Sequence, residues 1–233
     1  MSQFTLDGEE VGFREVETVM QASLAAGRWI PHLCYHPDFP AHGSCRLCVV
    51  RQNGQFVAAC TARAADGSVV ESNTAELNDK RRTLLQLLFV EGNHFCPSCE
   101  KSGNCLLQST AYDLGMMSPH FDHFYPDRPV DASHPDMLLD FNRCIMCALC
   151  VQASREVDRK NVFAMGGRGM RGRRVIINSE SGKLADTDFA ATDRAANICP
   201  VGVIIRKRVG FAIPIGERKY DKEPASVVEV ATK

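Results

Sequence analysis

The stretch CYHPDFPAHGSCRLC, residues 34–48, decides the fold of the first part of the chain because it gathers three cysteines on one loop. Two residues separate Cys45 from Cys48, ten separate Cys34 from Cys45, and eleven separate Cys48 from Cys60. This is a widened version of the plant-type pattern, in which two close cysteines and two more distant ones bind a 2Fe-2S cluster. We therefore predict that these four thiolates bind one 2Fe-2S cluster.

The residues around this loop predict a small unit of strands and one helix. Asp-Gly at 7–8 and Asn-Gly at 53–54 are two-residue hairpin turns, each between short apolar runs. A helix is expected from about Val16, with Gly27 at its C-terminal end. The order of hairpin, helix and further strands predicts a β-grasp domain over residues 1–76.

A second complete group of four cysteines lies near the C-terminus. Cys144, Cys147 and Cys150 are separated by two residues each, and Cys199 lies far downstream. In two-cluster ferredoxins such a run ends in a cysteine that serves the other cluster, and here that position is Ser154. The other three positions of that cluster, counted back from Cys199, also lack cysteine: they are Phe189, Thr192 and Ala195. All four ligands of one cluster are absent together, so the remaining four predict a single 4Fe-4S cluster.

The middle group is incomplete, because Cys96, Cys99 and Cys105 supply only three thiolates. His94 stands just before them and is the candidate fourth ligand of a second 4Fe-4S cluster. A lone histidine is more often a surface or core residue than a ligand, but beside an incomplete cysteine set the ligand role is favoured. By analogy with His-ligated 2Fe-2S centres, an imidazole in place of a thiolate raises the reduction potential.

Zinc is the main rival metal for these sites. Cysteines two residues apart also bind tetrahedral zinc, but zinc ribbons use two such pairs, and in the first group only Cys45 and Cys48 are paired. On this alternative the protein is a zinc-binding interaction module without redox activity. Disulfides are disfavoured because the total of eleven cysteines leaves one thiol unpaired.

The remaining sequence divides the chain into further parts of an α+β protein. A helix is expected from an N-cap at Asn73 to about Val90, and another near residues 188–197. We predict a small helical His-(Cys)3 4Fe-4S domain at residues 77–118, followed by a proline-rich connector at 119–134. A ferredoxin-like 4Fe-4S domain is expected at 135–212, and a charged docking tail at 213–233.

Composition excludes several classes of partner and predicts the compartment. The formal net charge of -1 provides no field for capturing nucleic acid or an acidic membrane. The basic run of Arg168, Arg171, Arg173 and Arg174 lacks interleaved aromatic residues and is expected to dock a subunit or shield a cluster. The N-terminus has no signal pattern and no apolar run is long enough to span a bilayer, so a cytoplasmic protein is expected.

The sequence offers no site for converting a substrate. It contains no glycine-rich dinucleotide fingerprint, no phosphate loop, and no cysteine left over to bind nickel or another catalytic metal. No catalytic residue is therefore assigned on this chain, and its expected work is to position clusters and tune their potentials.

Three segments carry a family resemblance over nearly the whole chain. PHLCYHPDF with GSCRLCVV, EGNHFCPSCEKSGNCLLQ, and RCIMCALCVQAS with NICPVGVI resemble the N-terminal iron-sulfur region of the large electron-transfer subunit of NADH:quinone oxidoreductase. The chain ends before the molybdopterin-oxidoreductase-like domain that follows in that family. This shorter form resembles the small iron-sulfur subunit in the diaphorase half of NAD-reducing nickel-iron hydrogenases. One departure is the loop between His94 and Cys96, where Phe95 alone separates residues that lie further apart in the respiratory family.

The resemblance implies an electron-transfer subunit within a heteromultimeric oxidoreductase. Single electrons would pass through one 2Fe-2S and two 4Fe-4S clusters between a flavoprotein NAD(H)-binding diaphorase subunit and the small iron-sulfur and large nickel-iron subunits of a hydrogenase. FMN and the nickel-iron centre are expected on those partners. The alternative is the same role in respiratory NADH:quinone oxidoreductase, in an iron-iron hydrogenase or in a formate dehydrogenase.

Overall fold

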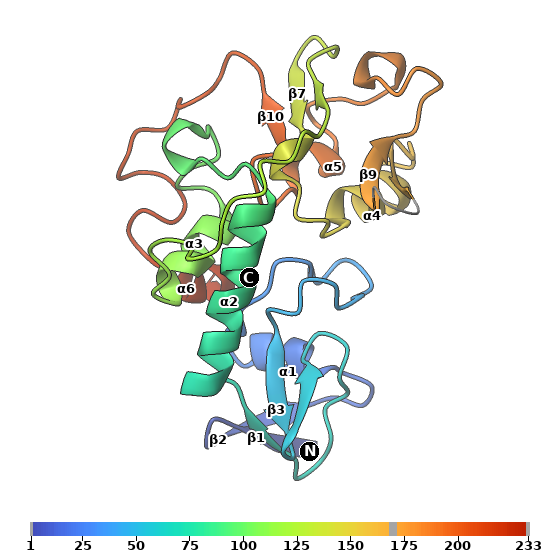
Figure 1. Cartoon of the computed structure of the whole chain (residues 1–233). Coiled ribbons are helices and arrows are strands. Elements are labelled where there is room, and N and C mark those ends of the chain that lie inside the picture. Colours follow the sequence, from blue (N-terminus) through green and yellow to red (C-terminus); the bar gives the residue numbers. More distant parts are fainter. Residues whose placement is uncertain (1, 168–171, 232–233) are drawn as a thin grey trace.

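A computed structural model describes residues 2–167 and 172–231 and shows three groups of elements arranged along one long helix (Figure 1). The chain mixes small, mainly antiparallel sheets with short helices, as the predicted α+β class requires. Within the described residues, no helix is both long and apolar enough to cross a membrane. Arg168 and Arg171 of the basic run lie outside the described residues.

The first group of elements is a five-stranded sheet with one covering helix. The strand order is β2-β1-β5-β3-β4, with β1 and β5 parallel and every other pair antiparallel. Its elements are β1 (Ser2–Leu6), β2 (Glu9–Phe13), α1 (Val19–Ala25), β3 (Val49–Gln52), β4 (Gln55–Ala58) and β5 (Val69–Glu71). Both predicted hairpin turns join adjacent antiparallel strands.

The prediction that the first helix starts at Val16 is wrong. Val16 has a φ of 68° and is 72% exposed, and α1 begins three residues later. The reason is a capping box: the Thr18 hydroxyl accepts a hydrogen bond from the Gln21 amide, while the Gln21 side chain accepts one from the Thr18 amide. Gly27 does follow the helix, in the left-handed conformation (φ 73°) that favours glycine.

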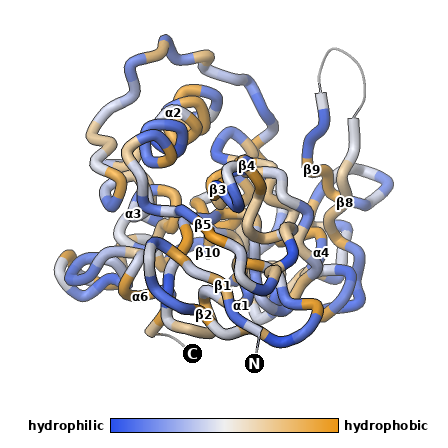
Figure 2. Tube along the Cα trace, turned by 90° about the horizontal axis from the view of Figure 1, so that it is seen from below, coloured by the Kyte–Doolittle hydropathy of each residue, from blue (hydrophilic) through white to orange (hydrophobic). Residues whose placement is uncertain are grey.

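The long helix α2 (Ala75–Glu91) links the first group to the rest of the molecule (Figure 1). Viewed near its axis, α2 carries both hydrophilic and hydrophobic residues (Figure 2). Its N-cap is Thr74, one residue after the predicted Asn73, since the Thr74 hydroxyl accepts from the Leu77 amide. A buried arginine, Arg81, fixes α2 to the first sheet through hydrogen bonds to the carbonyls of Leu47 and Val49.

The second group of elements follows α2 and includes the C-terminal tail. It contains the 3-10 turn η1 (Cys96–Ser98), α3 (Leu106–Asp113) and α6 (Ala225–Ala231). Helices α3 and α6 lie side by side (Figure 1), and the amide of the buried Ala225 donates to the Ser109 hydroxyl. The tail therefore folds back onto its own chain.

The third group contains a three-stranded sheet and a separate hairpin. Its elements are β6 (Val130–Asp131), β7 (Met137–Asp140), η2 (Phe141–Arg143), α4 (Leu149–Glu156), β8 (Phe163–Gly166), β9 (Arg174–Ile177), η4 (Leu184–Asp186), α5 (Arg194–Asn197) and β10 (Ile204–Arg206). The strand order is β10-β7-β6, with β8 paired to β9. The helix expected at 188–197 is only α5, because the Asp193 carboxylate turns back to accept from the Ala190 amide.

Candidate iron-sulfur sites

The first cysteine group comes together on the loops around β3 and β4. Cys34, Cys48 and Cys60 are buried and Cys45 is partly exposed. The Cys45 amide lies 3.4 Å from the Cys34 sulfur, and the Cys48 and Cys60 sulfurs are 3.3 Å apart. The loop from residue 32 to residue 47 has no regular secondary structure, so its conformation comes from turns and from packing against the sheet.

Within each of these two pairs, hydrogen bonding lowers the pKa of one thiol and raises that of the other. Hydrogen bonds from Cys45 lower the pKa of Cys34 to about 5, and the hydrogen bond to Cys34 raises the pKa of Cys45. In the same way, a hydrogen bond lowers the pKa of Cys48 and raises that of Cys60. The thiolate is the form of cysteine that binds metals, so a lowered pKa favours the metal-binding form of Cys34 and Cys48.

Three histidines near the first group, His32, His36 and His42, have hydrogen-bond partners other than the cysteine sulfurs. His32 is buried and its Nδ1 lies 2.7 Å from the Ile30 carbonyl oxygen. His36 Nε2 lies 3.0 Å from the Arg194 guanidinium, and His42 Nε2 lies 3.0 Å from the Ser44 hydroxyl.

The middle group lines one small cavity together with His94. Cys96, Cys99 and Cys105 contribute to its wall, on η1, just after η1 and at the N-cap of α3. The His94 Nε2 is buried and has no hydrogen-bond partner. Burial, followed by the positive charge of Arg143, lowers the pKa of His94 to about 4. An uncharged imidazole with an unsatisfied nitrogen is the form in which histidine binds a metal.

The short loop between His94 and Cys96 does not prevent this arrangement. Phe95 is 70% exposed, so its ring points away from the cavity and leaves the histidine and the cysteine on the same side. Space for the imidazole comes from Gly92, where a Cβ atom would lie 2.6 Å from the His94 Nε2. The donor set of one imidazole and three thiols fits a 4Fe-4S cluster.

All four cysteines of the third group line another small cavity, otherwise walled mostly by apolar side chains. Met146 and Ala148 have φ angles of 58° and 57°, and these two left-handed residues bend the loop between the first three cysteines. Burial raises the pKa of Cys144 to about 11 and raises the pKa of Cys147 and Cys150 well above its usual range. Iron binding would therefore displace protons from this site.

Ordinary core packing occupies three of the four positions at which a second ferredoxin cluster would have its ligands, and the fourth, Thr192, is exposed. Ser154 is buried and its hydroxyl accepts from the Val162 amide at 2.8 Å. Phe189 is buried against the ring of Phe163, with 5.4 Å between centroids, and Ala195 is fully buried.

Among residues 2–167 and 172–231, no three histidine, cysteine, aspartate or glutamate side chains are placed to hold a single metal ion. A single ion needs all its ligands in direct contact around one point. Cluster ligands instead bind different irons of one larger core.

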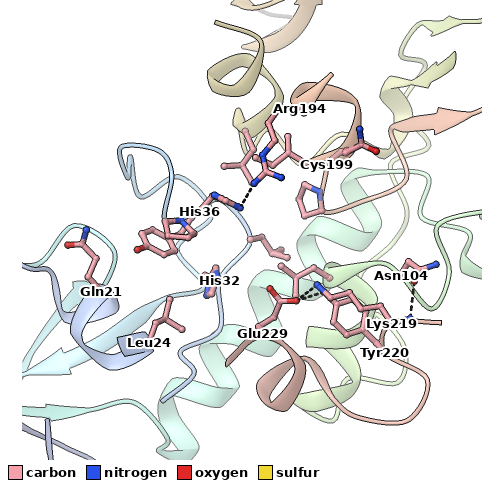
Figure 3. Close-up of a pocket in the computed structure, with 18 of the residues that line it drawn as sticks. Gln21, Leu24, His32, His36, Asn104, Arg194, Cys199, Lys219, Tyr220 and Glu229 are labelled. Carbon is pink, nitrogen blue, oxygen red and sulfur yellow. Dashed lines mark hydrogen bonds and ion pairs between the residues drawn. The ribbon is translucent and has the colours of Figure 1, made fainter. Parts of the chain in front are cut away.

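A larger cavity of about 840 Å³ lies where the three groups of elements meet (Figure 3). Its walls include His36 and Arg194, and Lys219, Tyr220 and Glu229 from the tail. These polar groups satisfy one another: the Lys219 ammonium and the Tyr220 hydroxyl both donate to the Glu229 carboxylate, at 2.6 and 2.7 Å.

Residues outside the cysteine motifs also shape the sites, and the sequence reasoning missed them. The Arg143 guanidinium lies 3.6 Å from the Cys99 sulfur, and a Cβ atom at Gly202 would lie 2.7 Å from that sulfur. The only available signal was position: Arg143 directly precedes Cys144, and Gly202 closely follows Cys199.

Three family models match successive parts of the chain. They describe a 2Fe-2S iron-sulfur cluster binding domain at residues 1–75, an NADH-ubiquinone oxidoreductase-G iron-sulfur binding region at residues 81–120, and a 4Fe-4S single cluster domain at residues 137–205.

Whole-chain relatives match over almost the full length. The gamma subunit of the NAD-reducing hydrogenase HoxS from Cupriavidus necator is 41% identical over 94% of this chain and 93% of its own. A solved structure, of an NAD+-reducing [NiFe]-hydrogenase in the H2-reduced state, superposes with a TM-score of 0.93 at 54% identity, covering 98% of both chains. The G subunit of NADH-quinone oxidoreductase from Rickettsia typhi is 27% identical over 94% of this chain, which spans 32% of that protein.

Proposed function

Because the chain belongs to the family of the gamma, or HoxU-type, iron-sulfur subunits of NAD-reducing hydrogenases, we propose that it relays single electrons between the NAD(H) side and the nickel-iron side of such an enzyme. The higher identity to the hydrogenase relatives, 41% and 54% against 27%, favours this assignment over the respiratory complex. The partners are then a flavoprotein diaphorase subunit, which holds FMN, and the small and large hydrogenase subunits, which hold the nickel-iron centre.

The chain carries a 2Fe-2S domain followed by 4Fe-4S domains. We propose their ligands as follows: Cys34, Cys45, Cys48 and Cys60 for the 2Fe-2S cluster, His94, Cys96, Cys99 and Cys105 for the first 4Fe-4S cluster, and Cys144, Cys147, Cys150 and Cys199 for the second. The observation that carries the middle assignment is the buried, unpartnered His94 Nε2 in the cavity of three cysteines. When bound, such clusters accept and donate single electrons.

The protein's own residues hold the ligands in place and keep water away from them. The third site has mostly apolar walls, and its cysteines are buried (Cys147 and Cys199) or partly buried (Cys144 and Cys150). Both features lower the local polarity, which is one determinant of cluster potential. The role that we propose for the chain itself is to position the clusters and to tune their potentials.

The finer architecture follows the same proposal. We infer a β-grasp domain at 1–76, a helical His-(Cys)3 domain at 77–118, a connector at 119–134, a ferredoxin-like domain at 135–212 and a docking tail at 213–233. Support comes from the five-stranded sheet covered by α1 and from the boundaries of the three family models. We also infer a reducing compartment, the cytoplasm, since cysteines that serve as cluster ligands must be protected from forming disulfides.

Anaerobic purification with metal analysis and electron paramagnetic resonance (EPR) of the reduced protein tests the assignment. About ten irons per chain are expected, with one 2Fe-2S and two 4Fe-4S signals. His94→Ala should remove or alter the middle signal alone, while His123→Ala, at an exposed histidine of the connector, should leave all three. Stoichiometric zinc without visible charge-transfer absorption would reject the function, and an unchanged spectrum in His94→Ala would reject His94 as a ligand.

A further inference from the structure

One arginine connects two of the proposed cluster sites. Arg143 is the last residue of η2 and directly precedes Cys144, so its backbone belongs to the third site. Its side chain nevertheless lines the cavity of the middle site together with His94 and Cys99.

The contacts of the guanidinium fix its position against the middle site. Its Nη1 donates to the Cys99 sulfur at 3.6 Å and to the Gly202 carbonyl oxygen at 3.2 Å. Its Nε forms an ion pair with the Asp140 carboxylate at 3.0 Å, and both side chains are at most 20% exposed. This charge is therefore less screened than a surface charge.

Gly202 makes this approach possible. A Cβ atom there would lie 2.7 Å from the Cys99 sulfur and 3.5 Å from the Arg143 Nη1. The backbone of the third group of elements, at Gly202, therefore packs directly on Cys99, a proposed ligand of the middle site. The Arg143 side chain belongs to the same contact.

We propose that Arg143 is a positioning residue of the middle site that raises its reduction potential. This inference rests on the proposed function. Reduction adds one electron, and so one negative charge, to the site without forming or breaking a bond. A fixed positive charge and an N–H donor at the Cys99 sulfur stabilise the more negative state. The same side chain links the two cluster units through its contacts with Cys99 and Gly202.

The test is a redox titration of the full chain followed by EPR, with the potentials of all three clusters measured in each variant. In Arg143→Gln, the ratio of reduced to oxidised middle cluster at a fixed potential should fall about tenfold, which is a shift of about 59 mV toward negative values. Arg143→Lys keeps the charge and should recover most of the shift. Asp140→Asn removes the opposing charge but keeps an oxygen acceptor at the N-cap of η2, and it should shift the potential in the positive direction.

Arg128→Gln is the matched control. Its guanidinium donates to the Cys144 carbonyl at 2.9 Å rather than to a sulfur, so its loss should move the middle potential less than Arg143→Gln does. An unchanged middle potential in Arg143→Gln, or a negative shift in Asp140→Asn, would overturn the inference. If Arg143→Gln fails to assemble the middle cluster, the sign of the Asp140→Asn shift decides. Absence of a middle signal in the unsubstituted protein would instead refute the proposed function.

Discussion

Replacing Arg81 by methionine should destabilise the attachment of α2 to the first sheet. Arg81 is 1% exposed, and its guanidinium donates to the backbone carbonyls of Leu47, Val49 and Ser72 at 3.0, 2.8 and 2.7 Å. Methionine fills most of the same space but has no donor. Three carbonyls thereby lose a partner in an interior that water does not reach.

The expected cost follows from two opposing effects. A lost hydrogen bond to a buried group costs about 2 kcal/mol, so three carbonyls cost about 6 kcal/mol. Against this, burial lowers the pKa of Arg81 from 12.5 to about 10, and removing that buried charge recovers about 3 kcal/mol of desolvation. The net loss of stability is about 3 kcal/mol.

The assay is urea denaturation of the full, cluster-loaded chain without oxygen, followed by the 2Fe-2S signal. A loss of this size should lower the midpoint by about 1 M. Because Arg81 bonds to the carbonyl of Leu47, next to Cys48, the 2Fe-2S signal should be lost before the 4Fe-4S signals. Lys80→Met on the same helix removes an exposed ion pair with Glu76 and a cation–π contact with the ring of Phe56, and should cost about 1 kcal/mol. Equal midpoints for Arg81→Met and the unsubstituted chain, or an equal loss in Lys80→Met, would refute this reasoning.

Three further perturbations test the sites. Gly92→Ala should displace the His94 imidazole and alter the middle EPR signal, because the new Cβ would lie 2.6 Å from Nε2. Gly12→Ala, with open space around it, should leave that signal unchanged. A normal middle signal in Gly92→Ala would contradict the proposed ligand geometry. Ser154→Ala removes the acceptor for the amide just before β8 and should lower stability by about 1–3 kcal/mol in thermal unfolding, and an unchanged melting temperature would contradict that role. In the iron-free chain, burial raises the pKa of Cys105 to about 12, above the value near 9 of the unfolded thiol. The contribution of this thiol to stability should therefore be complete below pH 9 and should decline toward pH 12. A stability that rises over this range would contradict the burial of this thiol.

The sequence alone could propose three ligand sets, because cysteine spacing is a local property with few explanations. The incomplete set of three cysteines pointed to His94, and the structure places that side chain in their cavity. Arg81 was missed although a signal existed: it lies midway between Leu77 and Leu85 on one buried helical face, where a charge needs partners. Arg143 had no such signal, because its contacts depend on how two separate units pack together.

Helix boundaries were predicted less well, because side-chain hydrogen bonds decide them. Thr18 and Thr74 each cap a helix with a hydroxyl, and each displaced the expected start. The Asp193 carboxylate similarly ended the expected helical region before α5. Apolar periodicity does not report these local competitions.

The packing explains how three sites on separate loops can work as one relay. Cys34, Cys105, Cys147 and Cys199 are buried in one continuous hydrophobic core, so proposed ligands from every group of elements belong to it. Protein interiors are close-packed and deform little. Under the proposed ligand assignment, the separations between the clusters are therefore set by the same contacts that stabilise the fold. It also follows that loss of one cluster should loosen its neighbours, since each ligand loop is part of the wall that supports the others.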